Sequence, residues 1–298
     1  MLIPLVTAIC YSETREITIF SVCIAICVGL GILINFQQPK STIMYAKEGF
    51  VTVALSWVVL SIFGSFPFTL SEYIPNYIDA FFETVSGFST TGASILNDVE
   101  ILPKSLLMWR SLTHWIGGMG VLVFLMAILP LSGSGNLYLL KAESPGPSVS
   151  KLVPRVKPTA MFLYGIYIVF TIVEIIMLLV GGLDLFESLT LAFGTAGTGG
   201  FAIKNTGIAE YSPYIQYVIT AFMILFGIDF SLYYGAIFRG IKTFLKSEEF
   251  RVYIGIIAFS TLFIFMNSGY MFSDGESAFR NILFTVGSTV TSTGYGVT

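Results

Sequence analysis

The chain has 298 residues, of which 55% are hydrophobic and only 11% are charged, and its mean hydropathy is +0.83. These values lie far outside those of soluble globular domains, so the composition excludes that class and predicts a protein of the lipid bilayer. The formal net charge is only −3, and we expect no nucleic acid among the partners.

Six apolar runs are long enough to cross about 30 Å of hydrocarbon as helices. They cover residues 17–36, 49–70, 106–131, 160–180, 214–238 and 252–266. A seventh apolar run, residues 2–10, is too short to span a bilayer. We therefore expect residues 1–46 to form an N-terminal helical hairpin with a truncated first helix. No secretory leader is evident, because a charged start and a small-residue cleavage site are both missing.

Basic residues gather in three of the loops between these runs. They are Lys40 and Lys47, then Lys141, Lys151, Arg155 and Lys157, then Arg239, Lys242, Lys246 and Arg251. The positive-inside rule predicts that these three loops are cytoplasmic. Most of the acidic residues fall on the opposite side, which predicts an outer face that concentrates cations, although ordinary solvated loop acids are the alternative.

Three outer segments are too apolar to be plain loops. Two spans separate successive basic loops, so each outer segment must begin and end on the same side of the membrane. Residues 76–88, 184–193 and 276–290 would reach about half-way through a bilayer as helices, at ~1.5 Å per residue. Non-helical backbone is tolerated at that depth only where protein buries it or it lines an aqueous cavity. We interpret the three segments as re-entrant helices that end at a pore.

Each re-entrant segment is followed by hydroxyl or small residues and then by glycine. Gly92, Gly200 and Gly294 align with separations of 108 and 94 residues, and the repeated unit is span, half-helix, glycine-centred turn, span. The predicted fold is an all-α multi-pass membrane protein with such units around a central pore. We expect repeats at 47–135 and 158–240, a cytoplasmic linker at 136–157, an incomplete third repeat at 241–298 and no fourth repeat.

These residue types suit a filter for a dehydrated cation. Backbone carbonyls that point inward replace the hydration shell, glycine permits the required dihedral angles, and Thr and Ser add hydroxyl oxygens. The C-terminal end of each half-helix adds a partial negative charge that favours a cation. A single Thr-Gly pair is an ordinary turn, and glycine also serves close helix packing, so the interpretation depends on the three copies.

Four phrases carry a family resemblance: FFETVSGFSTTGA at 81–93, WRSLTHWIGGMGV at 109–121, AFGTAGTGGF at 192–201 and GSTVTSTGY at 287–295. With them the chain resembles the Trk/Ktr/HKT superfamily of potassium transporters, and within it the TrkH branch. The resemblance implies four units of potassium-channel type around one pore, K⁺ as the transported ion, no cofactor and no enzymatic activity. It further implies a homodimer of the complete protein in the plasma (inner) membrane and a cytoplasmic nucleotide-binding regulatory subunit.

The resemblance also implies which residues form three walls of a K⁺ selectivity filter. Gly200 is preferred to Gly199 because an aromatic residue follows it, as Tyr295 follows Gly294. Relatives that prefer sodium carry serine at the first filter glycine, so Gly92 favours potassium. The candidate filter residues are Thr90, Thr91, Gly92, Ala93, Thr198, Gly199, Gly200, Phe201, Ser292, Thr293, Gly294 and Tyr295.

Three other functions remain open. A sodium-selective or sodium-coupled transporter of the same superfamily is the first. An intramembrane hydrolase is the second, but the chain offers one histidine, His114, as a base and no G-x-S-G phrase. A structural membrane scaffold, which predicts no ion flux, is the third.

Four further side chains stand out. Glu174 and Asp229 fall inside predicted spans, where an ionisable group is costly and can mark a functional site. For both we favour the alternative, a hydrogen bond to a neighbouring helix in a protonated or paired state. For His114 we expect a packing role. We expect Arg110 to pair with Glu83 or Asp79.

Overall fold

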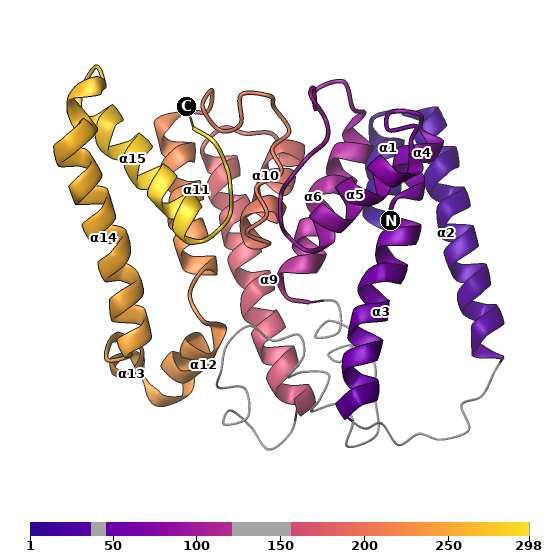
Figure 1. Ribbon diagram of the computed structural model, residues 1–298, viewed down its shortest axis with the longest axis horizontal. Coiled ribbons are helices and arrows are strands. Elements are labelled where there is room, and N and C mark those ends of the chain that lie inside the picture. The colour runs from indigo at the N-terminus through magenta and orange to yellow at the C-terminus, as the bar shows by residue number, and fades with distance from the viewer. Residues whose placement is uncertain (37–45, 121–155, 298) are drawn as a thin grey trace.

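The computed structural model describes residues 1–36, 46–120 and 156–297, and in these ranges every regular element is a helix (Figure 1). The predicted all-α fold is confirmed for this part of the chain. The helices are α1 (Leu2–Cys10), α2 (Thr14–Asn35), α3 (Ala46–Gly64), α4 (Phe66–Leu70), α5 (Tyr77–Phe88), α6 (Lys104–Gly118), α9 (Val156–Val180), α10 (Leu185–Ala196), α11 (Pro213–Phe226), α12 (Phe230–Arg239), α13 (Ile241–Leu245), α14 (Glu248–Ser268), the 3₁₀ turn η2 (Gly269–Met271) and α15 (Gly275–Val290).

Four spans among the described residues are long and apolar enough to cross a membrane. They are Thr14–Asn35, Val51–Leu70, Met161–Val180 and Glu248–Met271, which agree with four of the six predicted runs. Each of them exposes several large apolar side chains, as expected where lipid replaces water as the solvent. The predicted run 106–131 begins inside α6, and residues 121–131 lie outside the described residues.

The predicted span over residues 214–238 is not one straight helix, although its two parts together are long and apolar enough to count as one bent span. The structure has two helices there, α11 and α12, bent by 82° at the break between them. The carboxylate of Asp229 accepts the backbone N–H of Ser231 at 2.9 Å and so caps a new helix. Gly227 packs so tightly that a Cβ there would lie 2.5 Å from the Tyr253 hydroxyl. Capping by Asp229 and close packing at Gly227 together end α11, although the apolar run of the sequence continues to residue 238.

The three predicted re-entrant segments correspond to α5, α10 and α15, which have 12, 12 and 16 residues. Each begins at a side chain that accepts a backbone N–H of its own first turn: Asn76, Asp184 and Asp274. At ~1.5 Å per residue they are too short to cross a bilayer. In Figure 1 all three lie in the upper half of the molecule, away from α13.

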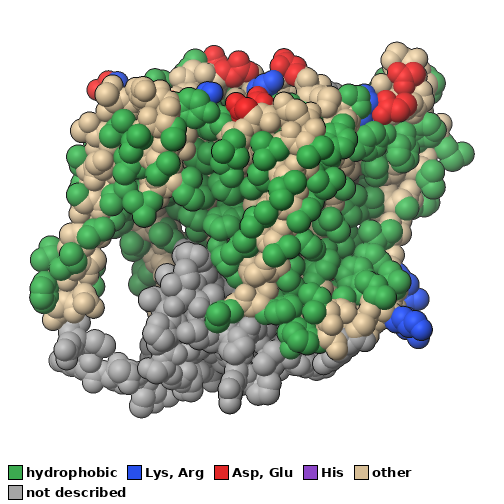
Figure 2. All heavy atoms as spheres, turned by 180° about the vertical axis from the view of Figure 1, so that it is seen from behind, with side chains coloured by type: hydrophobic (Ala, Val, Ile, Leu, Met, Phe, Trp, Pro, Cys, Tyr) green, Lys and Arg blue, Asp and Glu red, His purple; other side chains and the backbone are tan. Residues whose placement is uncertain are grey.

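The two ends of the molecule differ in charge. Figure 2 shows acidic side chains gathered at the end that carries the loops after the short helices, a hydrophobic band below them, and a group of Lys and Arg at the other end. Lys242, Lys246 and Arg251 are exposed in the segment from α13 to α14. The basic residues of the first two predicted cytoplasmic loops lie outside the described side chains.

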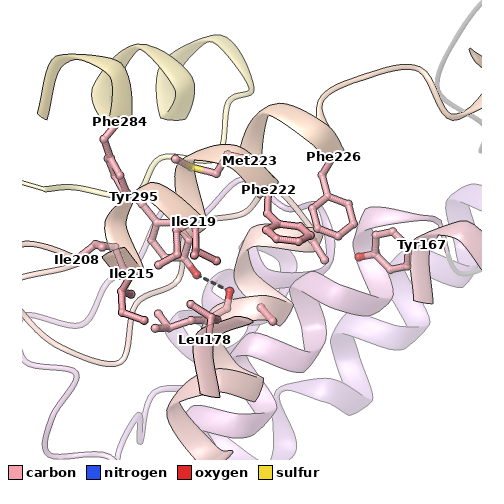
Figure 3. Packing of buried hydrophobic residues seen from close by; sticks show 14 of the residues in the cluster. Tyr167, Leu178, Ile208, Ile215, Ile219, Phe222, Met223, Phe226, Phe284 and Tyr295 are labelled. Atoms are coloured by element: carbon pink, nitrogen blue, oxygen red, sulfur yellow. Dashed lines mark hydrogen bonds between the residues drawn. The ribbon is translucent and has the colours of Figure 1, made fainter. Parts of the chain in front are cut away.

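The largest apolar core joins α9, α10 and α11 to the segment that follows α15. Figure 3 shows Tyr167, Phe222, Phe226 and Tyr295 packed in this core. A second core holds α5 and α6 against α1, α2 and α4, with Phe20 and Leu106 fully buried. These two cores place the C-terminal ends of the short helices next to one another.

Candidate functional site

The short helices α5, α10 and α15 end in the same unusual backbone turn. Thr90, Thr198 and Ser292 follow them with φ of 54°, 51° and 55°, a left-handed conformation that residues with a Cβ rarely adopt. Two residues later stand the aligned glycines, whose φ values are 74°, 74° and 84°. We call residues 90–93, 198–201 and 292–295 the first, second and third glycine segments.

Hydrogen bonds close each turn in the same way. A backbone N–H donates to the carbonyl five residues earlier, which is the wide bond that closes a helix C-terminus on a left-handed residue. The three bonds are Thr91 to Ser86 at 3.0 Å, Gly199 to Gly194 at 3.0 Å and Thr293 to Ser288 at 2.9 Å. Because the same turn follows α5, α10 and α15, it belongs to the repeated unit of the fold and not to a single loop.

The glycine segments contact one another in chain order. A Cβ on Gly92 would lie 1.9 Å from the carbonyl oxygen of Gly199, and a Cβ on Gly200 would lie 2.1 Å from that of Thr293. A Cβ on Gly294 would meet no atom within 4 Å. The first segment therefore abuts the second and the second abuts the third, at a distance that only glycine allows.

Aromatic side chains of the second and third segments anchor each of them to the preceding unit. The Phe201 ring lies 4.0 Å from that of His114 on α6. The Tyr295 hydroxyl donates to the carbonyl of Leu191 on α10 at 3.1 Å, drawn as a dashed line in Figure 3. Ala93 occupies the same position of the first segment and is exposed, as Gly294 is. Among the described residues, the three segments form an arc whose two ends, at Ala93 and Gly294, are exposed.

A cavity of about 380 Å³ lies against the C-terminal ends of the short helices. Residues from all three units line it, among them Thr90, Thr198 and Thr291. Gly118 and Gly227, where α6 and α11 end, also line it, and so do the carboxyl-bearing residues Asp229 and Glu249. A cation that leaves the glycine segments on this side would enter a space with hydroxyl, carbonyl and carboxylate oxygens.

The other predicted residues have definite places. Arg110 pairs with Glu83 at 2.8 Å, which decides between the two carboxylates left open by the sequence. His114 is fully buried and packs against Gly199 and Phe201, in agreement with a packing role.

Glu174 is also fully buried. Its carboxyl lies beside the hydroxyl of Thr195, but neither carboxyl oxygen has a hydrogen bond of ordinary geometry among the described residues. The expected hydrogen bond to a neighbouring helix is therefore not formed within this part of the chain.

Sequence reasoning missed the break at Gly227 and the equivalence of Gly118 and Gly227 in successive units. Gly118 packs against Gly197, and Gly227 packs against Thr291, the equivalent residue of the next unit. The separation of 109 residues between the two glycines nearly equals the 108 residues that separate the first two aligned glycines, so extending the repeat alignment would have found them.

The fold and the converging glycine segments define a helical membrane protein whose short helices end at one common place. The TrkH family model, described as "Cation transport protein", matches residues 14–273, and the chain belongs to that family.

Relatives with curated names cover nearly all of this chain. The Trk system potassium uptake protein TrkH of Escherichia coli K12 is 32% identical over 305 residues, which are 99% of this chain and 62% of that protein. The protein of the same name from Salmonella typhimurium is 34% identical over 259 residues, 84% of this chain and 53% of its own length. The chain therefore spans less than two thirds of the length of these relatives.

A solved structure is similar throughout. The crystal structure of the potassium transporter TrkH from Vibrio parahaemolyticus matches with a TM-score of 0.85 and 27% identity, over 100% of this chain and 62% of that one.

Proposed function

We propose that this chain belongs to the pore-forming subunit of a potassium uptake system, and that its three glycine segments form walls of a K⁺ selectivity filter. The observation that carries the proposal is the close contact of Gly92 with the Gly199 carbonyl and of Gly200 with the Thr293 carbonyl. Residues 90–93, 198–201 and 292–295 thereby converge in one place. The names of the relatives in Escherichia coli and Salmonella typhimurium support potassium as the ion.

The mechanism follows from backbone chemistry. A K⁺ ion that sheds its water is met by carbonyl and hydroxyl oxygens, whose rigid spacing makes the exchange favourable for one ion size. The C-terminal ends of α5, α10 and α15 point their partial negative charge at this place. A membrane potential supplies about 2.3 kcal/mol per charge for each 100 mV.

The arc of glycine segments needs a fourth wall to surround an ion. Within the described part of the chain, the exposed Ala93 and Gly294 form its two edges. In our proposal the repeats are 47–135, 158–240 and a third that begins at 241, with a linker at 136–157 between the first two and the hairpin 1–46 before them. The fourth wall comes from further sequence of the same protein or from another chain.

The proposal extends to partners and location. The exposed Lys242, Lys246 and Arg251 support a cytoplasmic face at the α13 end by the positive-inside rule. A nucleotide-binding regulatory subunit would dock on this face, and two copies of the complete protein would pair in the plasma (inner) membrane. Chemical cross-linking in membranes that contain the regulatory subunit would test both contacts.

Replacing Gly92 by serine tests the filter assignment. Gly92 has a φ of 74°, and a Cβ there would collide with the Gly199 carbonyl. We expect Gly92→Ser to displace that carbonyl and lower the ratio of K⁺ to Na⁺ uptake at least about tenfold, or ~1.4 kcal/mol. The complete protein would be assayed in cells that lack their own potassium uptake systems.

Gly255→Ser is the matched control, because a Cβ at Gly255 meets no atom within 4 Å. Wild-type ion preference in the Gly92→Ser variant would contradict the filter assignment. Sodium preference in the unsubstituted protein would favour the sodium-transporting alternative instead.

A further inference from the structure

A buried ion pair lies behind the first two glycine segments. Glu83 on α5 and Arg110 on α6 are 1% and 3% exposed, and the Nε of Arg110 donates to Oε1 of Glu83 at 2.8 Å. Burying two charges costs desolvation free energy, so a buried ion pair is by itself weak evidence for stability. We therefore ask which other groups Glu83 and Arg110 contact.

Glu83 holds the backbone that leaves the first glycine segment. The Ser94 hydroxyl donates to its Oε1 at 2.9 Å, and the Ile95 backbone N–H donates to its Oε2 at 3.1 Å. Both residues follow Ala93 directly in the chain. One carboxylate on a rigid helix therefore sets the position of the first segment at its outer end.

Arg110 holds the corresponding part of the second segment. One Nη donates to the Ala202 carbonyl at 3.2 Å, and the other donates to the Ser94 hydroxyl at 3.3 Å. The guanidinium lies 3.9 Å from the centre of the Phe201 ring. Arg110 thus contacts Phe201 of the second glycine segment and the residue that directly follows each of the two segments, and it does so with a planar, rigid set of donors that lysine lacks.

No equivalent ion pair lies at the boundary between the second and third glycine segments in the part of the chain that the structure describes. The repeat separations of 108 and 109 residues place Leu191 at the position of Glu83 and Ile219 at that of Arg110. There the Tyr295 hydroxyl donates to the Leu191 carbonyl at 3.1 Å. The charged contact is therefore specific to the first boundary among those that the structure describes.

We propose that Glu83 and Arg110 are a pair of positioning residues that set the spacing of the first two glycine segments and thereby the preference for K⁺ over Na⁺. This inference rests on the proposed function. The carboxylate neutralises the guanidinium, so the pair braces the segments without a net positive charge that would repel the transported cation. Ion preference depends on the positions of the backbone carbonyl oxygens that coordinate the ion. Arg110 fixes the carbonyl of Ala202, which directly follows Phe201 of the second segment.

The substitution Arg110→Lys tests whether the hydrogen bonds of Arg110 matter independently of its positive charge. Lysine keeps the positive charge beside Glu83 but cannot contact Ala202, Ser94 and the carboxylate together. We expect the complete protein with this substitution to reach the membrane, to take up K⁺, and to lose at least about fivefold in its ratio of K⁺ to Na⁺ flux in proteoliposomes. Glu83→Gln should lower the ratio in the same direction.

A double variant distinguishes a role of the ion pair in positioning the glycine segments from a role in folding alone. Glu83→Leu with Arg110→Met removes both charges and fills the space, so it should fold even where a single substitution leaves a buried charge unpaired. We expect it to show the same loss of ion preference. Arg15→Gln, at the exposed ion pair with Glu72, is the control and should leave the ratio unchanged.

An unchanged flux ratio in Arg110→Lys or in the folded double variant would overturn the inference, even if both fluxes fell together. Failure of both variants to fold would also overturn it, because the pair would then serve folding alone. Absence of K⁺ preference in the unsubstituted protein would instead overturn the proposed function.

Discussion

Three hydroxyl residues carry the backbone strain of the candidate filter. Thr90, Thr198 and Ser292 adopt left-handed φ values at equivalent positions, although glycine would do so at lower cost. Such strain is of order 1–3 kcal/mol per residue and persists only where the surroundings over-determine it. The retention of a side chain at all three positions agrees with a role for the hydroxyl groups, two of which belong to residues that line the cavity below.

Gly199 and His114 offer a test of packing behind the second segment. A Cβ on Gly199 would lie 1.3 Å from Nδ1 of the fully buried His114. We expect Gly199→Ala to destabilise the protein by about 1–3 kcal/mol through overpacking. Adding His114→Ala should restore part of this loss, because it frees the space that the new methyl group needs.

Thermal unfolding in detergent of the wild type, both single variants and the double variant completes this cycle. Strictly additive effects of the two substitutions would show that His114 does not limit the space at Gly199.

At the scale of elements, the break between α11 and α12 places a carboxylate on the wall of the cavity. Asp229 caps α12 through Ser231 and also lines the cavity. Its two roles are separable, because asparagine caps a helix about as well as aspartate but carries no charge.

We expect Asp229→Asn to keep the wild-type stability and to lower the K⁺ flux at limiting concentrations. Asp229→Ala should in addition lose about 0.5–2 kcal/mol of stability through the missing cap. Thermal unfolding and flux would be measured on the same preparations. A drop in stability for the asparagine variant as large as that for alanine would show that the charge, rather than the cap, holds α12.

A carboxylate that caps a helix also joins the N-terminal hairpin to the first unit. The carboxylate of Glu13 accepts the backbone N–H groups of Lys104 and Ser105 at 2.7 and 3.1 Å. These are unpaired donors in the first turn of α6, so Glu13 caps a helix that lies far along the chain. The hairpin thereby supports the helix that carries Arg110 and His114.

At the scale of the molecule, the loops that follow the first two glycine segments are joined through Asn205. Its side-chain amide donates to Asp98 at 2.8 Å, and its side-chain oxygen accepts the N–H of Val99 at 2.9 Å. The hydrogen bond from Asn205 is the main reason that the pKa of Asp98 lies below its ordinary value of 3.8.

A folded-state pKa below the unfolded one stabilises the protein above the unfolded value, and this contribution is lost as the pH falls through the folded value. We therefore expect the melting temperature to fall, as the pH is lowered from above 3.8 to well below it, by less in Asp98→Asn than in the wild type. Because Asp98 is exposed, the difference should be small. Equal pH dependence in both proteins would contradict the contribution of this contact.

The sequence alone determined the helical fold, four of the six apolar spans and the three short helices, because hydropathy and the aligned glycines are local or periodic signals. It also indicated the twelve candidate filter residues through the repeat and the family resemblance, and those residues stay a prediction.

Only the tertiary structure decided the order in which the glycine segments touch, the pairing of Arg110 with Glu83 and the bend at Gly227. The physical reason is sequence separation. The contacts of Arg110 with Ala202 and of Tyr295 with Leu191 join residues 92 and 104 positions apart, and only the packing of whole helices brings such residues together. The same holds for the hydroxyl residues in left-handed turns, whose conformation is imposed by their surroundings against their own preference.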